Sequence, residues 1–297
     1  MKPTVTSRSL PPFVVLLTPW ALVYGAFFVF PFVFSFVLAF LHYNPLNVGA
    51  TSGAGLENFT RLVGDERFVR ALRNTLVFVV GTVPMTTVAA LGLALLLRGR
   101  VPGKGAFKAG FFLPSIVSAV VISLLFKLFY APNGGLNHGL SFLGVAGHGW
   151  LTDPTTALGA IMVMDVWSAV GYYAIIFDAA FAGIPREFHE AATLEGAGFK
   201  DTLRYVYIPA LRPVIAFVLV INTIRSFQIF IEVFVMTQGG PLGATDTLVL
   251  YLYEAAFRNL DYGYASAIAY TVFVLSGVFS IVAMKRLSPR WRAAAGG

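Results

Sequence analysis

Six long apolar segments limit what this chain can fold into more than any other feature of its sequence. A helix of about 20 apolar residues crosses the hydrocarbon core of a membrane. Only 12% of the residues are charged, whereas roughly 25% are charged in soluble domains. We therefore predict an all-α membrane protein with six transmembrane helices in a single domain, residues 1–297. The predicted spans are residues 13–40, 75–97, 109–130, 157–182, 213–236 and 265–284.

Lysine and arginine are distributed unevenly over the polar segments between these spans. Fourteen of the 21 lie before the first span, between the second and third, between the fourth and fifth, and after the sixth. Because cytoplasmic segments of membrane proteins are rich in lysine and arginine, we predict that the N- and C-termini are cytoplasmic. This topology also accounts for the net charge of +7, and no nucleic acid partner is predicted.

The first outer loop opposes this rule, because it carries Arg61, Arg67, Arg70 and Arg73. Its apolar residues recur at helical spacing toward the second span, which indicates an interfacial helix leading into that span. A docking surface is the alternative interpretation. The sequence leaves both open.

Several kinds of chemistry have no residues to support them. The chain has no cysteine, and its four histidines are scattered in a way that resembles no zinc site. The sequence has no GxxxxGK[ST] phosphate loop, and no nucleophile lies in a recognisable set with a base. We therefore predict that the chain is not an enzyme and holds no metal.

Polar side chains within the predicted spans indicate a pathway for a solute. A polar group in hydrocarbon is costly unless it meets a partner or a water-filled cavity. Hydrogen-bonding groups beside aromatic rings suit a polyhydroxylated solute. The alternative is that they only hold the helices together. The candidates are Asp165, Trp167 and Tyr172 in the fourth span and Asn222, Arg225, Gln228 and Glu232 in the fifth.

The longest polar stretch between apolar segments, residues 190–209, lies between the fourth and fifth spans. Pro185 to Glu195 fits a short helix, and Gly196 with Gly198 fits a turn. A second helix is predicted from Asp201, ending at Pro209. Two helices of this length carry too little apolar surface to stand alone, so they must lean on the membrane surface or on a partner protein.

The spacing within this stretch resembles the EAA loop of ABC importer permeases, whose pattern is EAA, three residues, G, nine residues, I, one residue and LP. Here Glu190-Ala191-Ala192 and Gly196 match, while Val206 and Ile208-Pro209 stand for I and LP. GLENF at 55–59 and SFQIF, MTQGGP and YLYEAAF within 226–257 resemble the carbohydrate-uptake type, on the side of the maltose and glycerol-phosphate permeases. The chain lacks the extra N-terminal spans and large outer domain of the maltose permease.

The resemblance implies a permease subunit in a bacterial or archaeal cytoplasmic membrane. Its partners would be a second similar permease, two ATP-binding subunits that hold ATP and Mg, an external solute-binding protein and membrane lipid. A cytoplasmic helix-turn-helix within residues 184–212 would couple to the ATPase, through Glu190, Ala191, Ala192, Gly196 and Pro209.

The solute implied by the resemblance is a sugar. One alternative is glycerol 3-phosphate or a related anion, which Arg225 could bind, although Asp165 and Glu232 would repel an anion that shares a cavity with them. A more remote alternative is a secondary transporter that uses the intramembrane charges for ion coupling.

Overall fold

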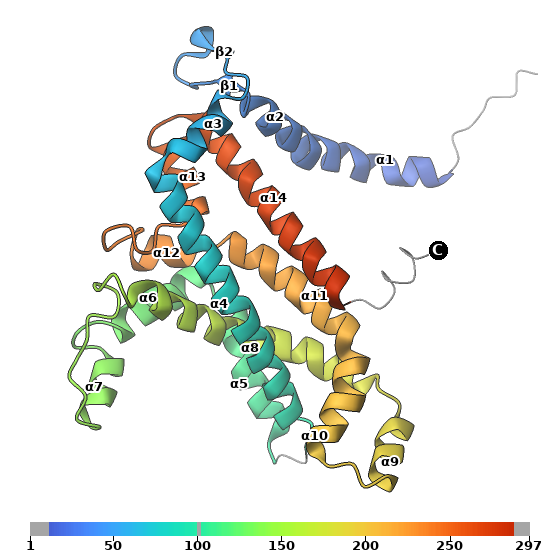
Figure 1. Cartoon of the computed structure of the whole chain (residues 1–297). Coiled ribbons are helices and arrows are strands. Elements are labelled where there is room, and N and C mark those ends of the chain that lie inside the picture. Colours follow the sequence, from blue (N-terminus) through green and yellow to red (C-terminus); the bar gives the residue numbers. More distant parts are fainter. Residues whose placement is uncertain (1–11, 100–101, 288–297) are drawn as a thin grey trace, which may run out of the picture.

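The computed structural model describes residues 12–99 and 102–287, which are mostly helical (Figure 1). Five of the described helices are long and apolar enough to cross a membrane, and there are six such spans if one sharply bent pair counts as one. Five of the basic residues used to predict topology lie outside the described residues: Lys2, Arg8, Arg100, Arg290 and Arg292.

The first span diverges from the rest of the chain. It consists of α1 (Pro12–Tyr24), a π-helical turn η1 (Gly25–Val29) and α2 (Phe30–Leu38). Figure 1 shows it leaving the helix bundle at an angle, and α2 contacts α14 (Tyr262–Leu287). Most of its side chains are exposed within this chain. Its apolar surface must therefore be covered by lipid or by another protein.

Short elements gather at one end of the bundle, which we call the α3 end (Figure 1). Strands β1 (Leu41–His42) and β2 (Ser52–Gly53) pair antiparallel around the 3-10 turn η2 (Val48–Ala50). Helix α3 (Glu57–Gly64) follows, and Asn58 donates to the carbonyls of Ala39 and Leu41 at 3.0 and 3.1 Å. Helix α13 (Leu248–Phe257) lies at the same end.

Helix α4 (Glu66–Leu96) begins ahead of residue 75, where the second span was expected to start. Its start is set by Asp65, whose carboxylate accepts from the backbone N–H groups of Arg67 and Phe68 at 2.9 and 3.2 Å. A side chain that caps the first turn satisfies donors that the helix itself leaves unpaired. Helix α4 packs against α8 (Ala157–Ala182) and α11 (Ile208–Phe227) in the centre of the bundle.

The third apolar segment was predicted as one helix and is instead two. Helix α5 (Lys104–Ile116) and helix α6 (Ala119–Phe129) meet at an angle of 99°. Pro114 has no backbone N–H to donate within α5, Val117 adopts an extended conformation, and Ser118 is also non-helical, with φ −55° and ψ 133°. Packing holds α5 in place: a Cβ added at Gly171 of α8 would lie 1.8 Å from the carbonyl oxygen of Phe111. Helix α7 (Gly135–Ser141) follows in the next loop.

The fifth span also differs from its prediction at both ends. Pro209 does not end a helix, because α10 (Phe199–Asp201), the π-helical η3 (Thr202–Tyr207) and α11 form one continuous helix. In the wide π turn the N–H of Ile208 donates to the carbonyl of Leu203, and Pro209 follows in α11 without ending the helix. Helix α11 then ends at Phe227, and a separate helix α12 (Ile231–Met236) follows the break.

Candidate functional site

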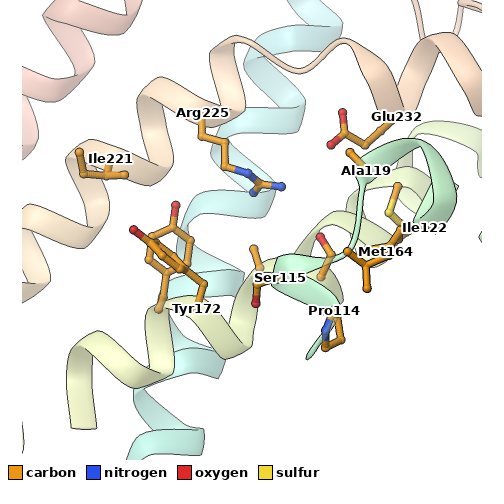
Figure 2. Close-up of a pocket in the computed structure, with 13 residues that line it drawn as sticks. Pro114, Ser115, Ala119, Ile122, Met164, Tyr172, Ile221, Arg225 and Glu232 are labelled. Carbon is orange, nitrogen blue, oxygen red and sulfur yellow. The ribbon is translucent and has the colours of Figure 1, made fainter. Parts of the chain in front are cut away.

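A cavity of about 410 Å³ lies between α5, α6, α8, α11 and α12, and we call it the polar cavity because Arg225 and Glu232 line it. Figure 2 shows Arg225 of α11 and Glu232 of α12 reaching toward it from one side and Ser115 and Tyr172 from the other. The bend after α5 and the break after α11 place these side chains where straight helices would not. The cavity therefore combines a cation, a carboxylate, hydroxyl groups and aromatic rings around one space.

Arg225 is held from behind by Asp165 of α8. The carboxylate accepts from two guanidinium nitrogens, at 2.6 Å from Nη2 and 3.4 Å from Nη1. The Asp165 side chain is only 1% exposed, whereas that of Arg225 is 39% exposed and lines the cavity. A buried charge is tolerated when it is paired and hydrogen-bonded. The pair joins α8 to α11, the helices that precede and follow the predicted coupling loop.

A second hollow of about 570 Å³ opens beside the break between α11 and α12. It is lined by Gln228 and shares Arg225 and Glu232 with the first cavity. Unwound backbone inside a membrane is tolerated only where it is buried in protein or lines a water-filled cavity. The two hollows thus adjoin at Arg225 and Glu232, and we call them together the polar region.

Two of the predicted pathway residues lie outside this polar region. Asn222 is 0% exposed between α4 and α11, and its amide donates to the carbonyl of Val83 at 3.5 Å. Trp167 is 50% exposed and its ring lies tilted against that of Phe126, with ring centroids 5.2 Å apart. The predicted residues that meet around the cavities are Asp165, Tyr172, Arg225, Gln228 and Glu232.

Ser115 is a cavity residue that the sequence analysis missed. It lies just after Pro114, and the bend that follows α5 brings it to the cavity wall. Its hydroxyl is buried and has no hydrogen-bond partner among the described residues. A proline within an apolar segment was the available signal that this helix would not run straight.

Helix α9 (Arg186–Leu194) lies at the end of the bundle opposite α3, which we call the α9 end (Figure 1). Glu190 and Ala191 are exposed and Ala192 is half-buried. Gly196 has a φ of 72°. The N–H of Gly196 donates to Thr193 and that of Ala197 to Ala192, an arrangement that ends a helix and favours glycine at the left-handed position. Exposed Phe188 and Leu194 add apolar surface.

A continuous packed cluster connects this end to the polar cavity. Tyr207 of η3 packs edge-on against Phe181 at the end of α8, with ring centroids 5.5 Å apart. The guanidinium of Arg98 lies over both rings, 4.4 Å from the centre of Tyr207 and 5.4 Å from that of Phe181. The same apolar cluster includes Tyr173, which lines the cavity. Pro209 is half-buried at the junction of η3 and α11.

The comparisons with known proteins agree on one family. The pattern of the family described as binding-protein-dependent transport system inner membrane component matches residues 62–293. The lactose transport system permease protein of Rhizobium radiobacter is 36% identical over 235 residues, 77% of this chain and 79% of the relative. The trehalose/maltose transport system permease protein of Thermococcus litoralis is 31% identical over 273 residues, 91% and 92% of the two chains.

A solved structure has the same fold. A chain of a bacterial ABC transporter involved in the import of the acidic polysaccharide alginate superimposes with a TM-score of 0.81 over 93% of this chain and 96% of that chain. The sequences are 23% identical, so this likeness concerns the fold alone. The resemblance to ABC importer permeases is confirmed, and the location is that of a multi-pass inner-membrane protein. This chain belongs to the family of binding-protein-dependent transport system inner membrane components.

Proposed function

We propose that this chain is the permease subunit of an ATP-driven, binding-protein-dependent sugar importer and forms half of its translocation pathway. The observation that carries this proposal is the attachment of an exposed EAA helix, α9, to the two helices that hold the cavity's ion pair. Movement of α9 would reach α8 directly and α11 through η3. The proposed cytoplasmic side is the α9 end.

The chemistry of the cavity suits an uncharged sugar. Arg225, Glu232 and Tyr172 offer donors, acceptors and an aromatic ring. The hydroxyl groups of a sugar can form hydrogen bonds with these donors and acceptors. The apolar face of the sugar ring can lie on the aromatic ring of Tyr172. The two relatives that are 36% and 31% identical are named for lactose and for trehalose/maltose transport.

Glycerol 3-phosphate is disfavoured as the solute by the charges around the cavity. The positive charge of Arg225 is already neutralised by Asp165, and Glu232 adds a second carboxylate. An anionic solute would therefore meet a net negative wall. A secondary transporter is also disfavoured, because it gives no role to the exposed helix α9 and because the relatives are transport system permeases.

The proposed partners follow from surfaces that this chain leaves uncovered. The exposed first span fits a second permease of similar fold, since its apolar side chains need a partner or lipid. Exposed Phe188 and Leu194 beside Glu190 on α9 fit a cleft in an ATP-binding subunit, and ATP and Mg would lie in two such subunits. A related alginate transporter was solved in complex with a periplasmic protein, which supports an external solute-binding protein here.

ATP would act by favouring one of two conformations of this assembly. Closure of the ATPases would pull the paired coupling helices together, and the packed cluster of Tyr207, Phe181 and Arg98 would transmit the movement to α8 and α11. The cavity would then open to the outside. A conformational change of this kind requires only that the partner binds the two states with different affinities.

The test of coupling is a double substitution in α9. Glu190→Ala with Gly196→Ala should abolish uptake by proteoliposomes that contain the complete transporter, while the solute-binding protein keeps its affinity for the solute. The matched control is Glu57→Ala with Gly64→Ala in α3, at the opposite end of the bundle. Solute movement by the purified chain alone, driven by an ion gradient without any ATPase, would contradict the proposal.

The test of the pathway uses Arg225→Ala and Gln228→Ala. Both should lower uptake and change the range of sugars that is transported, because both side chains line the polar region. Asn222 lies three residues before Arg225 on the same helix and outside the cavity, so Asn222→Ala is the control for the range of sugars. Unchanged uptake and sugar range in both cavity variants would exclude these residues from the pathway.

A further inference from the structure

We propose that Asp165 sets the charge selectivity of the cavity by neutralising Arg225 from behind, so that the cavity accepts neutral hydroxylated solutes and excludes anionic ones. Asp165 is then a positioning residue that acts on the solute through Arg225. The proposal rests on the proposed function, because it assumes that solute passes through the cavity.

The geometry separates the two sides of the guanidinium. Asp165 accepts from Nη1 and Nη2, and its side chain is 1% exposed, so no solute reaches it. A guanidinium has five N–H groups, and the carboxylate accepts from two of them. Figure 2 shows the guanidinium of Arg225 reaching into the space between Tyr172 and Glu232. The remaining N–H groups can therefore donate to hydroxyl oxygens of a solute.

The charges that face the cavity determine what Arg225 can bind. Among the described residues that line the cavity, Arg225 carries a positive charge and Glu232 a negative one. These two side chains form no ion pair with each other in the described part of the chain. With Asp165 behind Arg225, the three groups together carry one net negative charge. Arg225 thus serves as a hydrogen-bond donor whose positive charge is already neutralised by Asp165. An anionic solute is therefore attracted to it only weakly.

Replacement of Asp165 by asparagine would remove this neutralisation and keep the shape of the side chain. The amide oxygen can still accept from one guanidinium nitrogen, so Arg225 would keep its direction while its positive charge becomes available to the solute. An uncompensated charge a few ångströms away changes the binding of an ion by about tenfold or more. Asp165→Asn should therefore improve binding of an anionic sugar relative to a neutral one by about tenfold.

The experiment compares two probes that differ in one group, methyl glucoside and methyl glucuronide. Binding of each is measured by equilibrium dialysis to the complete transporter in nanodiscs, without the solute-binding protein, so that selection occurs in the membrane. We expect the wild-type transporter to prefer the glucoside. Asp165→Asn should shift the ratio of dissociation constants toward the glucuronide, and added salt should weaken the gain.

Asp178→Asn is the matched control, because Asp178 also lies on α8 and pairs with Lys108 but does not line the cavity. It should leave the ratio unchanged. If Asp165→Asn fails to fold, Glu232→Gln replaces it, since it removes a negative charge from the same wall and should shift the ratio in the same direction.

Equal loss of both probes in Asp165→Asn and an unchanged ratio in Glu232→Gln would overturn the inference and leave Asp165 a structural counterion. The proposed pathway would survive that result, provided that the wild-type transporter binds the glucoside and Arg225→Ala does not. If the wild-type transporter binds neither probe and Arg225→Ala transports normally, the pathway itself is wrong, and the inference falls with it.

Discussion

The two ends of the bundle hold their charged side chains in opposite ways. At the α3 end, Arg67 pairs with Asp246 at 2.7 Å and with Glu254 at 2.6 Å, and Arg61 pairs with Asp261 at 2.7 Å. At the α9 end, Glu187, Glu190 and Glu195 are exposed and form no ion pair with any described residue. One end uses its charges to hold its own helices together, and the other leaves these three carboxylates without an ion pair among the described residues.

The same comparison explains two of the four arginines that opposed the predicted topology, Arg61 and Arg67. Arg61 lies 4.1 Å from the ring centre of Tyr264, and Arg67 lies 4.6 Å from that of Tyr251, besides their ion pairs. These two arginines therefore tie α3 and the start of α4 to α13 and α14. Their structural role in this chain is sufficient to explain their presence in a loop that was predicted to lie outside.

Removal of Arg67 should have the largest effect on stability. Arg67→Ala leaves Asp246, with a side chain 3% exposed, and Glu254, 12% exposed, without this partner. Breaking a buried ion pair from one side costs about 3–5 kcal/mol. Thermal unfolding of the purified chain in nanodiscs should show this loss. Arg258→Ala is the control, because Arg258 is 56% exposed and should cost under about 1 kcal/mol. Similar losses of stability in Arg67→Ala and Arg258→Ala would mean that burial does not determine how much an ion pair at this end contributes.

Removal of one hydroxyl from the same end should have a smaller, pH-dependent effect. Burial acts to raise the pKa of Asp65, but hydrogen bonds from Tyr251, Tyr264 and the backbone of Phe68 and Arg67 outweigh it and hold the pKa below its usual range. Tyr251→Phe removes one hydrogen bond to a charged group and should cost about 1.5–3 kcal/mol at neutral pH.

The sign of the pH dependence follows from the lowered pKa of Asp65. The stabilisation is complete above the unfolded-state value of about 3.9 and is lost as the pH falls through the lower folded-state value. The difference in unfolding temperature between wild type and Tyr251→Phe should therefore be constant near neutral pH and shrink below about pH 4. A difference that grows on acidification would contradict this account.

At the α9 end, a substitution at Gly196 should have a small effect on stability and a large effect on transport. Its φ of 72° is readily adopted by glycine and strained for alanine. Gly196→Ala should cost about 1–2 kcal/mol, less than Arg67→Ala, yet it should reduce ATP-dependent uptake strongly because it redirects the chain after α9. Gly198→Ala is the neighbouring control, since Gly198 has no positive φ. Equal uptake defects in the two variants would argue against a specific role for the turn at Gly196.

The sequence predicts the family and the apolar segments well because both depend on local patterns. Segment length identifies spans, and the spacing from Glu190 to Pro209 identifies the loop. The break after α5 is harder to predict, because it depends on Pro114 together with the close contact between Gly171 and Phe111, which are far apart in the chain. The helix continues through Pro209 because of the π turn at Thr202–Tyr207, which no sequence pattern predicts.

The cavity shows the same limit at the level of single residues. Asn222 and Ser226 are four residues apart and both face α4, whereas Arg225 faces the cavity from the same helix. Periodicity groups residues on a face of the helix but does not say whether that face meets a neighbour or a cavity. The partner of Arg225, Asp165, becomes evident only once α8 and α11 are placed side by side.

The smallest effect on stability should come from the carboxylates of α9, and it gives the strictest test of the comparison. Glu187→Gln with Glu195→Gln removes two negative charges that contact no described cation, so unfolding should change by less than about 0.5 kcal/mol. If these charges contact a basic partner, the same variant should show weaker stimulation of ATP hydrolysis in the assembled transporter. Added salt should weaken the same stimulation in the wild-type transporter, because it screens the charges. A large loss of stability would show that α9 is held by its charges as the α3 end is, and the contrast between the two ends would be lost.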